Sequence, residues 1–166
     1  MIVVTSDKYE ELYKEYYSIV SKVAYSYTRN IEDSQDIAQE VFIKLYRAHK
    51  VFNDDDHLTK WLIRVTINKS IDLLRQKKRE IIVDTEYVNN LQDKEEHDEK
   101  RLVMYDAVGS LKDIYKTVII LHYYDDYSIK DIASILKISE NNVKVRLNRA
   151  REKLKQIINE RAKKDE

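Results

Sequence analysis

The 166-residue sequence contains no cysteine, no proline and a single glycine, Gly109. Without cysteine the chain can form no disulfide, no thiolate nucleophile and no cysteine-ligated zinc site. The near absence of glycine and proline argues against β-hairpins, glycine-rich phosphate loops and dinucleotide-binding folds. No apolar run approaches the roughly 20 residues that span a bilayer, and the segment before Ser6 is too short for a secretory signal. We therefore expect a soluble, cytoplasmic, nearly all-helical protein that does not insert into a membrane.

Basic and acidic side chains balance at 30 each, but they are unevenly distributed. Residues 81–110 carry 3 basic and 8 acidic side chains, whereas residues 137–164 carry 10 basic and 3 acidic ones. A second basic segment, residues 64–79, holds 6 Lys and Arg side chains and 1 Asp. Two cationic surfaces suggest two contacts with a polyanion, although two solvated helix faces would give the same counts.

Apolar residues recur at helical spacing along most of the chain, with a break between residues 80 and 100. This pattern predicts an all-α fold of two small helical domains, residues 1–79 and 101–166. We expect the acidic segment between them, residues 80–100, to be a flexible linker. Because 43% of the residues are hydrophobic, the chain can bury a core.

Local signals place the helix ends in the first domain. Ser6 is positioned to cap the first helix, and Asn30 to end it in the left-handed conformation. We predict a second helix over about residues 33–48 and a third over about residues 57–79. Between them, residues 51–56 should form a loop whose three aspartates, Asp54 to Asp56, are available as helix caps.

In the second domain, residues 101–109 and about 112–124 have helical periodicity, and a helix-turn-helix pattern follows. Its first helix spans residues 128–136 and its second runs from residue 139 to about residue 162. Ser128 and Ser139 are the expected caps, Ser128 together with Asp131 in a capping box.

The second helix of this pattern has two different faces. Val143, Leu147, Ala150 and Leu154 fall on one narrow stripe when residues are placed at 100° intervals. The opposite face is rich in amide and guanidinium groups that can read base edges in a major groove: Asn141, Asn142, Val145, Arg146, Asn148, Arg149 and Lys153. DNA binding and a plain helical hairpin both fit this pattern.

The helix over residues 33–48 is also amphipathic. One side is apolar, and the other combines acid, amide, an isoleucine and arginine: Asp36, Gln39, Glu40, Ile43 and Arg47. This composition is typical of a protein–protein interface with an apolar anchor and a polar rim. A solvated helix face is the alternative.

The helix over residues 57–79 gathers an aromatic, an amide and two guanidinium groups on one face: Trp61, Arg64, Asn68 and Arg75. An aromatic that stacks on bases, next to cations that hold the backbone, is the chemistry of single-strand binding. Trp61 taken alone is as readily a core residue, and one tryptophan can serve both roles.

Two stretches resemble a known family. Asp36-Ile37-Ala38-Gln39-Glu40-Val41-Phe42, followed by Trp61-Leu62, Asn68, Asp72 and Arg75, resembles the second conserved region of bacterial sigma factors. Ser128 to Ser139, and Asn142 to Leu154, resemble the fourth region. The order of the two regions and the missing third region are similar to the small extracytoplasmic-function (ECF) class.

This resemblance implies roles for three surfaces. The surface that docks on core RNA polymerase would comprise Asp36, Gln39, Glu40, Ile43 and Arg47. The loop from Lys50 to His57 would capture a flipped base of the minus-ten element, whose contacts would be Phe52, Trp61, Arg64, Asn68, Arg75 and Lys78. The minus-thirty-five element would be read by Ser139, Asn141, Asn142, Lys144, Val145, Arg146, Asn148, Arg149 and Lys153.

The resemblance also implies partners and departures. Core polymerase and promoter DNA are the implied partners, together with an anti-sigma factor, which in this family can be membrane-anchored; we expect a monomer when no partner is bound. Lys112 follows Leu111 where the family often has proline, and Lys137 stands where the turn often has glycine. Lys137 must then adopt a left-handed or distorted turn.

Two other classes of function remain open at this point. A stand-alone helix-turn-helix regulator would bind duplex operators as a dimer, and an all-helical adaptor would not bind DNA. We expect no enzyme, cofactor or metal site, because the four histidines are scattered and no carboxylate pair has a plausible pocket.

Overall fold

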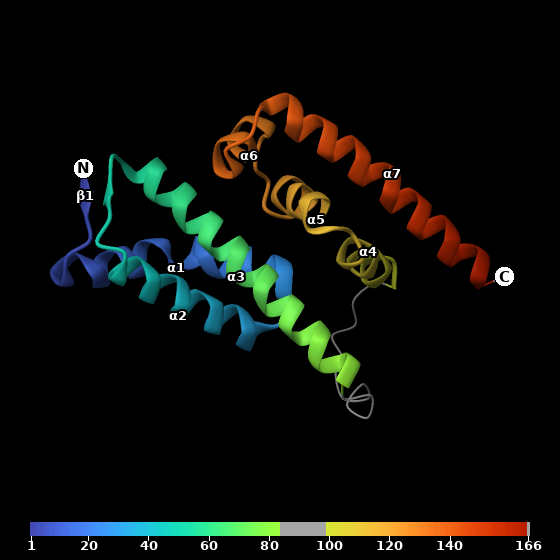
Figure 1. The fold of residues 1–166 in the computed structure, drawn as a ribbon, viewed down its shortest axis with the longest axis horizontal. Coiled ribbons are helices and arrows are strands. Elements are labelled where there is room, and N and C mark those ends of the chain that lie inside the picture. The colour runs from blue at the N-terminus through green and yellow to red at the C-terminus, as the bar shows by residue number, and fades with distance from the viewer. Residues whose placement is uncertain (84–98, 166) are drawn as a thin grey trace. The chain divides into compact units, whose positions relative to one another are not determined.

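The computed structural model describes the backbone of residues 1–83 and 99–165 (Figure 1). Most of the predicted linker, residues 84–98, lies outside the described residues. The first part contains β1 (Ile2–Val3), α1 (Ser6–Thr28), α2 (Ile31–Arg47), β2 (Val51–Phe52) and α3 (Asp55–Val83). The second contains α4 (Glu99–Gly109), α5 (Asp113–Ile119), the π-helix η1 (Ile120–Tyr124), α6 (Ile129–Leu136) and α7 (Glu140–Lys164). The prediction of two small helical domains is confirmed.

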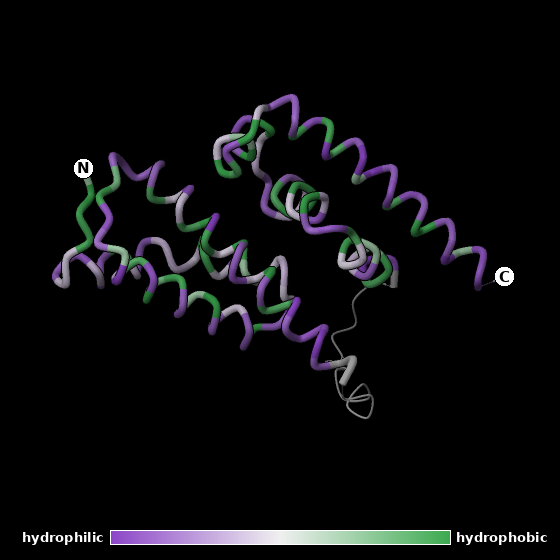
Figure 2. The backbone as a smooth tube through the Cα atoms, in the orientation of Figure 1, coloured by the Kyte–Doolittle hydropathy of each residue, from purple (hydrophilic) through white to green (hydrophobic). Residues whose placement is uncertain are grey.

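In the first domain, α1, α2 and α3 enclose one hydrophobic core. Along these helices hydrophobic positions recur among hydrophilic ones, as amphipathic helices require (Figure 2). The centre of the core is fully buried and is built from side chains of each helix, among them Val20, Phe42, Leu45, Leu58 and Leu62. Burial of this apolar surface is the main term that stabilises the domain.

A two-stranded antiparallel sheet closes one end of this domain. Ile2 pairs with Phe52 and Val3 with Val51, so the first residues of the chain lie against the segment between α2 and α3. The sequence predicted only a loop at residues 51–56. Pairing between strands so far apart in sequence leaves no local periodicity, and two residues are too few to show an alternating pattern.

The residues that flank α1, and the residue that caps α2, differ from the prediction. The residue that precedes α1 is Thr5, and Ser6 is already helical, with its hydroxyl 3.1 Å from the Tyr46 hydroxyl. Arg29, and not Asn30, adopts the left-handed conformation that ends α1, with φ of 51°. Asn30 instead caps α2, because its side-chain oxygen accepts a hydrogen bond from the Asp33 N–H at 2.9 Å. Asn30 could end the first helix or begin the second, and in the structure it begins the second.

The second domain packs α4 and α5 against α7. Its buried residues include Ala107, Val118, Leu121 and Leu147. The predicted single helix over residues 112–124 is two pieces, because its second half has π-helical hydrogen bonds such as Asp125 N–H to the Ile120 carbonyl at 3.0 Å.

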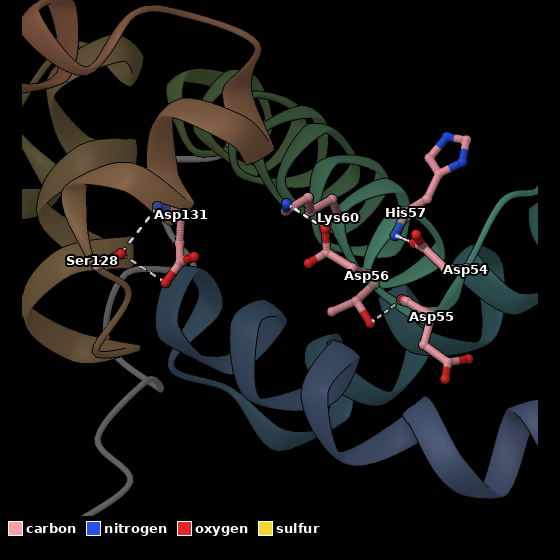
Figure 3. A network of polar contacts seen from close by, with 8 residues as sticks. Asp54, Asp55, Asp56, His57, Lys60, Ser128 and Asp131 are labelled. Carbon is pink, nitrogen blue, oxygen red and sulfur yellow. Dashed lines mark hydrogen bonds and ion pairs between the residues drawn. The ribbon is translucent and has the colours of Figure 1, made fainter.

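The predicted helix-turn-helix is present in α6 and α7, and of the predicted capping box the structure shows the half in which Ser128 accepts from the Asp131 N–H. The Ser128 hydroxyl accepts from the Asp131 N–H at 3.1 Å and donates to the Asp131 carboxylate at 2.8 Å (Figure 3). Lys137 has φ of 57°, the left-handed conformation expected at the turn, which costs a side chain with a Cβ roughly 1–2 kcal/mol. Ser139 caps α7 by accepting from the Asn142 N–H at 3.0 Å.

Candidate docking and nucleic-acid surfaces

The α2 face predicted for docking is exposed along its whole length. Its five residues are exposed, while Ile37, Val41 and Leu45 on the opposite side are buried. Ile43 keeps 46% of its surface exposed, so a large apolar side chain stands among polar neighbours. The α2 face therefore has the predicted composition, with one exposed apolar side chain among exposed polar ones.

One contact on this face was not predicted. The Lys69 ammonium of α3 lies 2.9 Å from a carboxylate oxygen of Glu40. The Glu40 side chain remains 62% exposed, and exposed pairs of this kind contribute only about 0–1 kcal/mol. Glu40 can therefore exchange Lys69 for another cationic partner at small cost. The two residues are 29 apart in sequence, so no short-range pattern could have shown the pair.

Two aromatic residues predicted to contact the minus-ten element are buried. Phe52 is 0% exposed and Trp61 is 8% exposed, and their ring centres lie 5.5 Å apart in an edge-to-face arrangement. The core interpretation of Trp61 therefore holds in this structure, while the predicted contacts of both residues with the minus-ten element stay predictions. Pairing with β1 turns Phe52 inward. Trp61 belongs to the same buried cluster as Leu58 and Leu62.

The remainder of the predicted minus-ten surface is cationic and polar. On α3, Asn68, Arg75 and Lys78 are exposed and Arg64 is half-buried. These positions follow helical spacing along one side of α3, so three cations and an amide form a line rather than a cluster. Such a line can follow a nucleic-acid backbone.

The loop that precedes α3, residues 50–57, is held by several hydrogen bonds. Asp54 accepts from the His57 N–H at 2.8 Å, which confirms its predicted role as a cap (Figure 3). The Asn53 N–H donates to His57 Nδ1 at 3.2 Å, so this imidazole nitrogen acts as the acceptor. The loop is therefore hydrogen-bonded to the first turn of α3 at two points.

The other two aspartates of this loop also have partners. The Lys60 ammonium lies 2.5 Å from the Asp56 carboxylate, one turn along α3. The Tyr16 hydroxyl of α1 donates to the Asp55 carboxylate at 3.1 Å. Burial of the phenol, supported by this hydrogen bond, raises the pKa of Tyr16 to about 12. The acidic cluster thus fixes the start of α3.

On α7 the predicted division of faces is confirmed. Val143, Leu147, Ala150 and Leu154 are buried. The predicted reading residues lie on the other side: Asn141, Lys144, Val145, Asn148, Arg149 and Lys153 are exposed, whereas Asn142 and Arg146 are half-buried. Ser139 is exposed, but its hydroxyl oxygen is used as the helix cap.

Hydrogen bonds along α7 orient several of these side chains. Arg146 Nε donates to the Asn142 side-chain oxygen at 3.1 Å. Arg151, which the sequence analysis did not single out, donates to the Asn148 side-chain oxygen at 2.9 Å and to the Tyr123 hydroxyl at 2.6 Å. An amide whose oxygen is already occupied presents its NH2 group to a ligand. Arginine three or four residues from asparagine on one helix is the signal that could have found these pairs.

The second domain also has an apolar groove that sequence reasoning missed. A cavity of about 540 Å³ lies between α4, η1 and α7, with Met104, Val108, Leu154 and Ile158 in its wall. Leu102, at 52% exposed, and Val103, at 44%, add apolar surface on α4. The helical periodicity predicted for residues 101–109 does not by itself indicate such a groove.

Two other features are absent from the described part of the chain. No helix there is long and apolar enough to cross a membrane. Within residues 1–83 and 99–165, no three histidine, aspartate or glutamate side chains gather where they could hold a metal ion.

Together these features define a class of protein: a two-domain helical protein with a helix-turn-helix in its second domain. The sequence pattern described as Sigma-70 region 2 matches residues 12–80, and the pattern described as Sigma-70, region 4 matches residues 101–154. The RNA polymerase sigma factor SigV of Bacillus subtilis is 31% identical over 78% of both chains. The ECF RNA polymerase sigma factor SigW of the same organism is 30% identical over 92% of this chain and 89% of its own. The chain belongs to the ECF family of RNA polymerase sigma factors.

Solved structures agree with this fold. The sigma factor RpoE in complex with the anti-sigma factor NepR from Bartonella quintana matches with a TM-score of 0.64 and 20% identity, over 93% of this chain and 98% of its own. CnrH, solved in complex with the cytosolic domain of CnrY, also has a TM-score of 0.64, with 23% identity over 93% and 90%. At these identities the likeness shows the fold.

Proposed function

We propose that this chain binds core RNA polymerase and directs it to promoters as an ECF sigma factor, with promoter DNA as its second partner. The observation that carries the proposal is the order of two family regions along one chain, each with its expected polar face exposed. Residues 1–79 form the polymerase-docking and minus-ten domain, residues 80–100 the linker, and residues 101–166 the minus-thirty-five domain.

The docking surface is the α2 face of Asp36, Gln39, Glu40, Ile43 and Arg47. Its exposed isoleucine and the weakly paired carboxylate of Glu40 support this assignment. An apolar anchor removed from water supplies affinity, and the surrounding polar groups select the partner.

The minus-ten surface differs from the one implied by the sequence alone. Asn68, Arg75 and Lys78 contact the separated strand, together with the accessible part of Arg64, and the loop of residues 50–57 binds the extruded base. Phe52 and Trp61 act beneath this surface, because their rings fill the core that carries the loop. Extruding a base costs a few kcal/mol, which contacts in the loop must offset.

The minus-thirty-five surface is the outer face of α7. Arg146, Arg149, Asn142 and Asn148 supply donors for base edges, and Lys144 and Lys153 supply charge for phosphates. The hydrogen bonds from Arg146 and Arg151 support this assignment, because they orient two amides before any DNA is bound.

The proposal includes no reaction catalysed by this chain and no cofactor. The chain acts in the cytoplasm, where it is a monomer when unbound, and an anti-sigma factor restrains it. The RpoE–NepR and CnrH–CnrY complexes, in which proteins of this fold bind such partners, support that restraint.

A stand-alone helix-turn-helix regulator is not favoured. It would use α7 in the same way, but it gives no role to the exposed α2 face. A helical adaptor without DNA binding leaves the oriented donors of α7 without a function.

Run-off transcription with purified core polymerase and fragments of genomic DNA tests the proposal. We expect specific transcripts only when this chain is added. Transcripts that do not depend on the chain, or tight binding of duplex DNA by a dimer without polymerase, would contradict it.

A further inference from the structure

The loop of residues 50–57 is fastened to the first residues of the chain. Ile2 pairs with Phe52 and Val3 with Val51 in the antiparallel sheet of β1 and β2. Side chains alternate along both strands, as a pleated sheet requires. Phe52 is fully buried and Ile2 packs against the same core, whereas Val3 and Val51 are 47% and 46% exposed. Each strand is therefore anchored by inward side chains and has an exposed valine at the paired position.

The far end of the same loop is fixed to α3. The Asn53 N–H donates to His57 Nδ1, and Asp54 caps the helix through the His57 N–H. The Phe52 ring lies edge-to-face against the His57 ring, with centres 5.3 Å apart. The backbone on both sides of Phe52 is thus restrained, by strand pairing before it and by hydrogen bonds after it.

We propose that β1 is a clip that holds the loop of residues 50–57 in the shape in which it binds an unpaired promoter base. Ile2 and Val3 are then positioning residues for promoter recognition, although neither contacts DNA. A loop that must order on binding loses conformational entropy and binds more weakly. The clip removes that loss, because the loop is ordered before the base arrives. This inference rests on the proposed function of the chain.

The clip can be opened without removing a core side chain. A strand pair of two residues is marginal by itself, and its strength depends on the β-propensity of its residues. Because Val3 is about half exposed, a substitution there acts on the pairing and leaves Ile2, Val4 and Phe52 in the core.

The first experiment compares two variants of Val3 in the complete holoenzyme. Val3→Gly weakens the pairing, and Val3→Thr is the matched control that keeps a β-branched residue. Val3 lies outside the loop of residues 50–57, so neither change alters a residue that is proposed to bind the base. The probe is a promoter fragment that the wild-type holoenzyme selects from DNA randomised through the minus-ten element. Open-complex formation is then measured on this fragment and on every single-base change within the element.

We expect the glycine variant to lose at least fivefold discrimination at one position of the element. Its affinity for core polymerase and its preference at the other positions should stay within twofold of wild type, and the threonine variant should match wild type throughout. Equal losses at every position, or a parallel loss of polymerase affinity, would mean a general loss of fold and would overturn the proposal. So would unchanged discrimination in the glycine variant.

A second experiment locks the clip. Val3→Cys with Val51→Cys introduces the only two thiols of a cysteine-free chain at paired positions. Directly opposed residues on antiparallel strands lie within the range that a disulfide spans. We expect the oxidised protein to keep the transcription and discrimination of its own reduced form, because the closed clip is the working state. Activity that is lost on oxidation and returns on reduction would overturn the proposal.

The two levels of failure are distinguishable. If the wild-type chain forms no holoenzyme that selects DNA, the proposed function fails and the clip fails with it. If the wild-type holoenzyme selects DNA and the glycine variant discriminates equally well, only the clip is wrong.

Discussion

The last helix and the segment that leads into the third helix were both predicted to face DNA, but they differ in where their side chains lie. On α7 the predicted donors lie on the outer face, and the apolar stripe is buried. In the loop and α3, the two predicted aromatics are in the core. The difference arises because polar side chains are rarely buried, whereas an aromatic ring serves equally well in a core or in a stacking surface.

This contrast separates two ways for a residue to affect promoter binding. In the proposed function the faces of α2 and α7 contact polymerase and DNA directly, so substitutions there should change binding and leave folding intact. Phe52, Trp61 and Tyr16 act through the fold, so substitutions there should change stability first.

The largest effect is expected on the α2 face. Gln39→Ala combined with Glu40→Lys should abolish capture of core polymerase, a loss of at least 100-fold, because the change reverses a charge at the centre of the docking surface. Binding is measured by pull-down, and circular dichroism checks the fold. Lys69→Ala is the control: it removes the partner of Glu40 and should leave affinity within threefold. Unchanged capture by the double variant would remove α2 from the docking surface.

Phe52→Ala should act on stability instead. Loss of a fully buried aromatic ring costs about 3–5 kcal/mol, measured as a lower free energy of unfolding in urea. Trp61, the only tryptophan, reports the same event, because its fluorescence should shift to the red when the neighbouring ring is removed. Asn53→Ala, at an exposed position next in sequence, should change stability by less than about 0.5 kcal/mol. A stable Phe52→Ala protein with impaired DNA binding would place Phe52 back among the DNA contacts.

Arg146→Ala and Arg149→Ala should each weaken binding to the upstream promoter element by about 1–3 kcal/mol if they read bases. The loss should be confined to particular base pairs, as tested with single-base changes in the element. A uniform loss on all sequences, with a smaller dependence on salt, would instead assign these residues to phosphate contacts.

Tyr16→Phe should have the smallest effect, a loss of about 1 kcal/mol from the hydrogen bond to Asp55. Because burial raises the pKa of Tyr16 to about 12 from the 10.0 that is usual for tyrosine, the folded state retains the phenolic proton more strongly than the unfolded state. The contribution is complete below pH 10 and is lost as the pH rises toward 12. Urea unfolding at a series of alkaline pH values should show a steeper decline for wild type than for Tyr16→Phe, and parallel declines would contradict this.

Most of the helices could be predicted from the sequence, because helical periodicity and capping residues are local signals. Ser139 and Asp54 cap their helices as predicted, and Lys137 is left-handed as predicted. The β1–β2 pair could not be found, because it joins residues about 50 positions apart without a repeating pattern. Asn30 was expected to end the first helix, but Arg29 ends it and Asn30 caps α2, because both residues lie at one short junction where either can end the helix.

The candidate surfaces were predictable to the extent that they are polar. The outer faces of α2 and α7 follow from the helical wheel alone. The partners Lys69 of Glu40 and Tyr123 of Arg151 come from other helices, and the groove beside α4 depends on how three elements pack. Such contacts require the tertiary structure.

The central claim is that this chain is the promoter-recognition subunit of a bacterial RNA polymerase. Sedimentation of the purified protein, alone and mixed with core polymerase, tests it most directly. We predict a folded monomer alone and a one-to-one complex in the mixture, which the Gln39→Ala, Glu40→Lys variant does not form. A folded monomer that stays free in the presence of core polymerase would contradict the account.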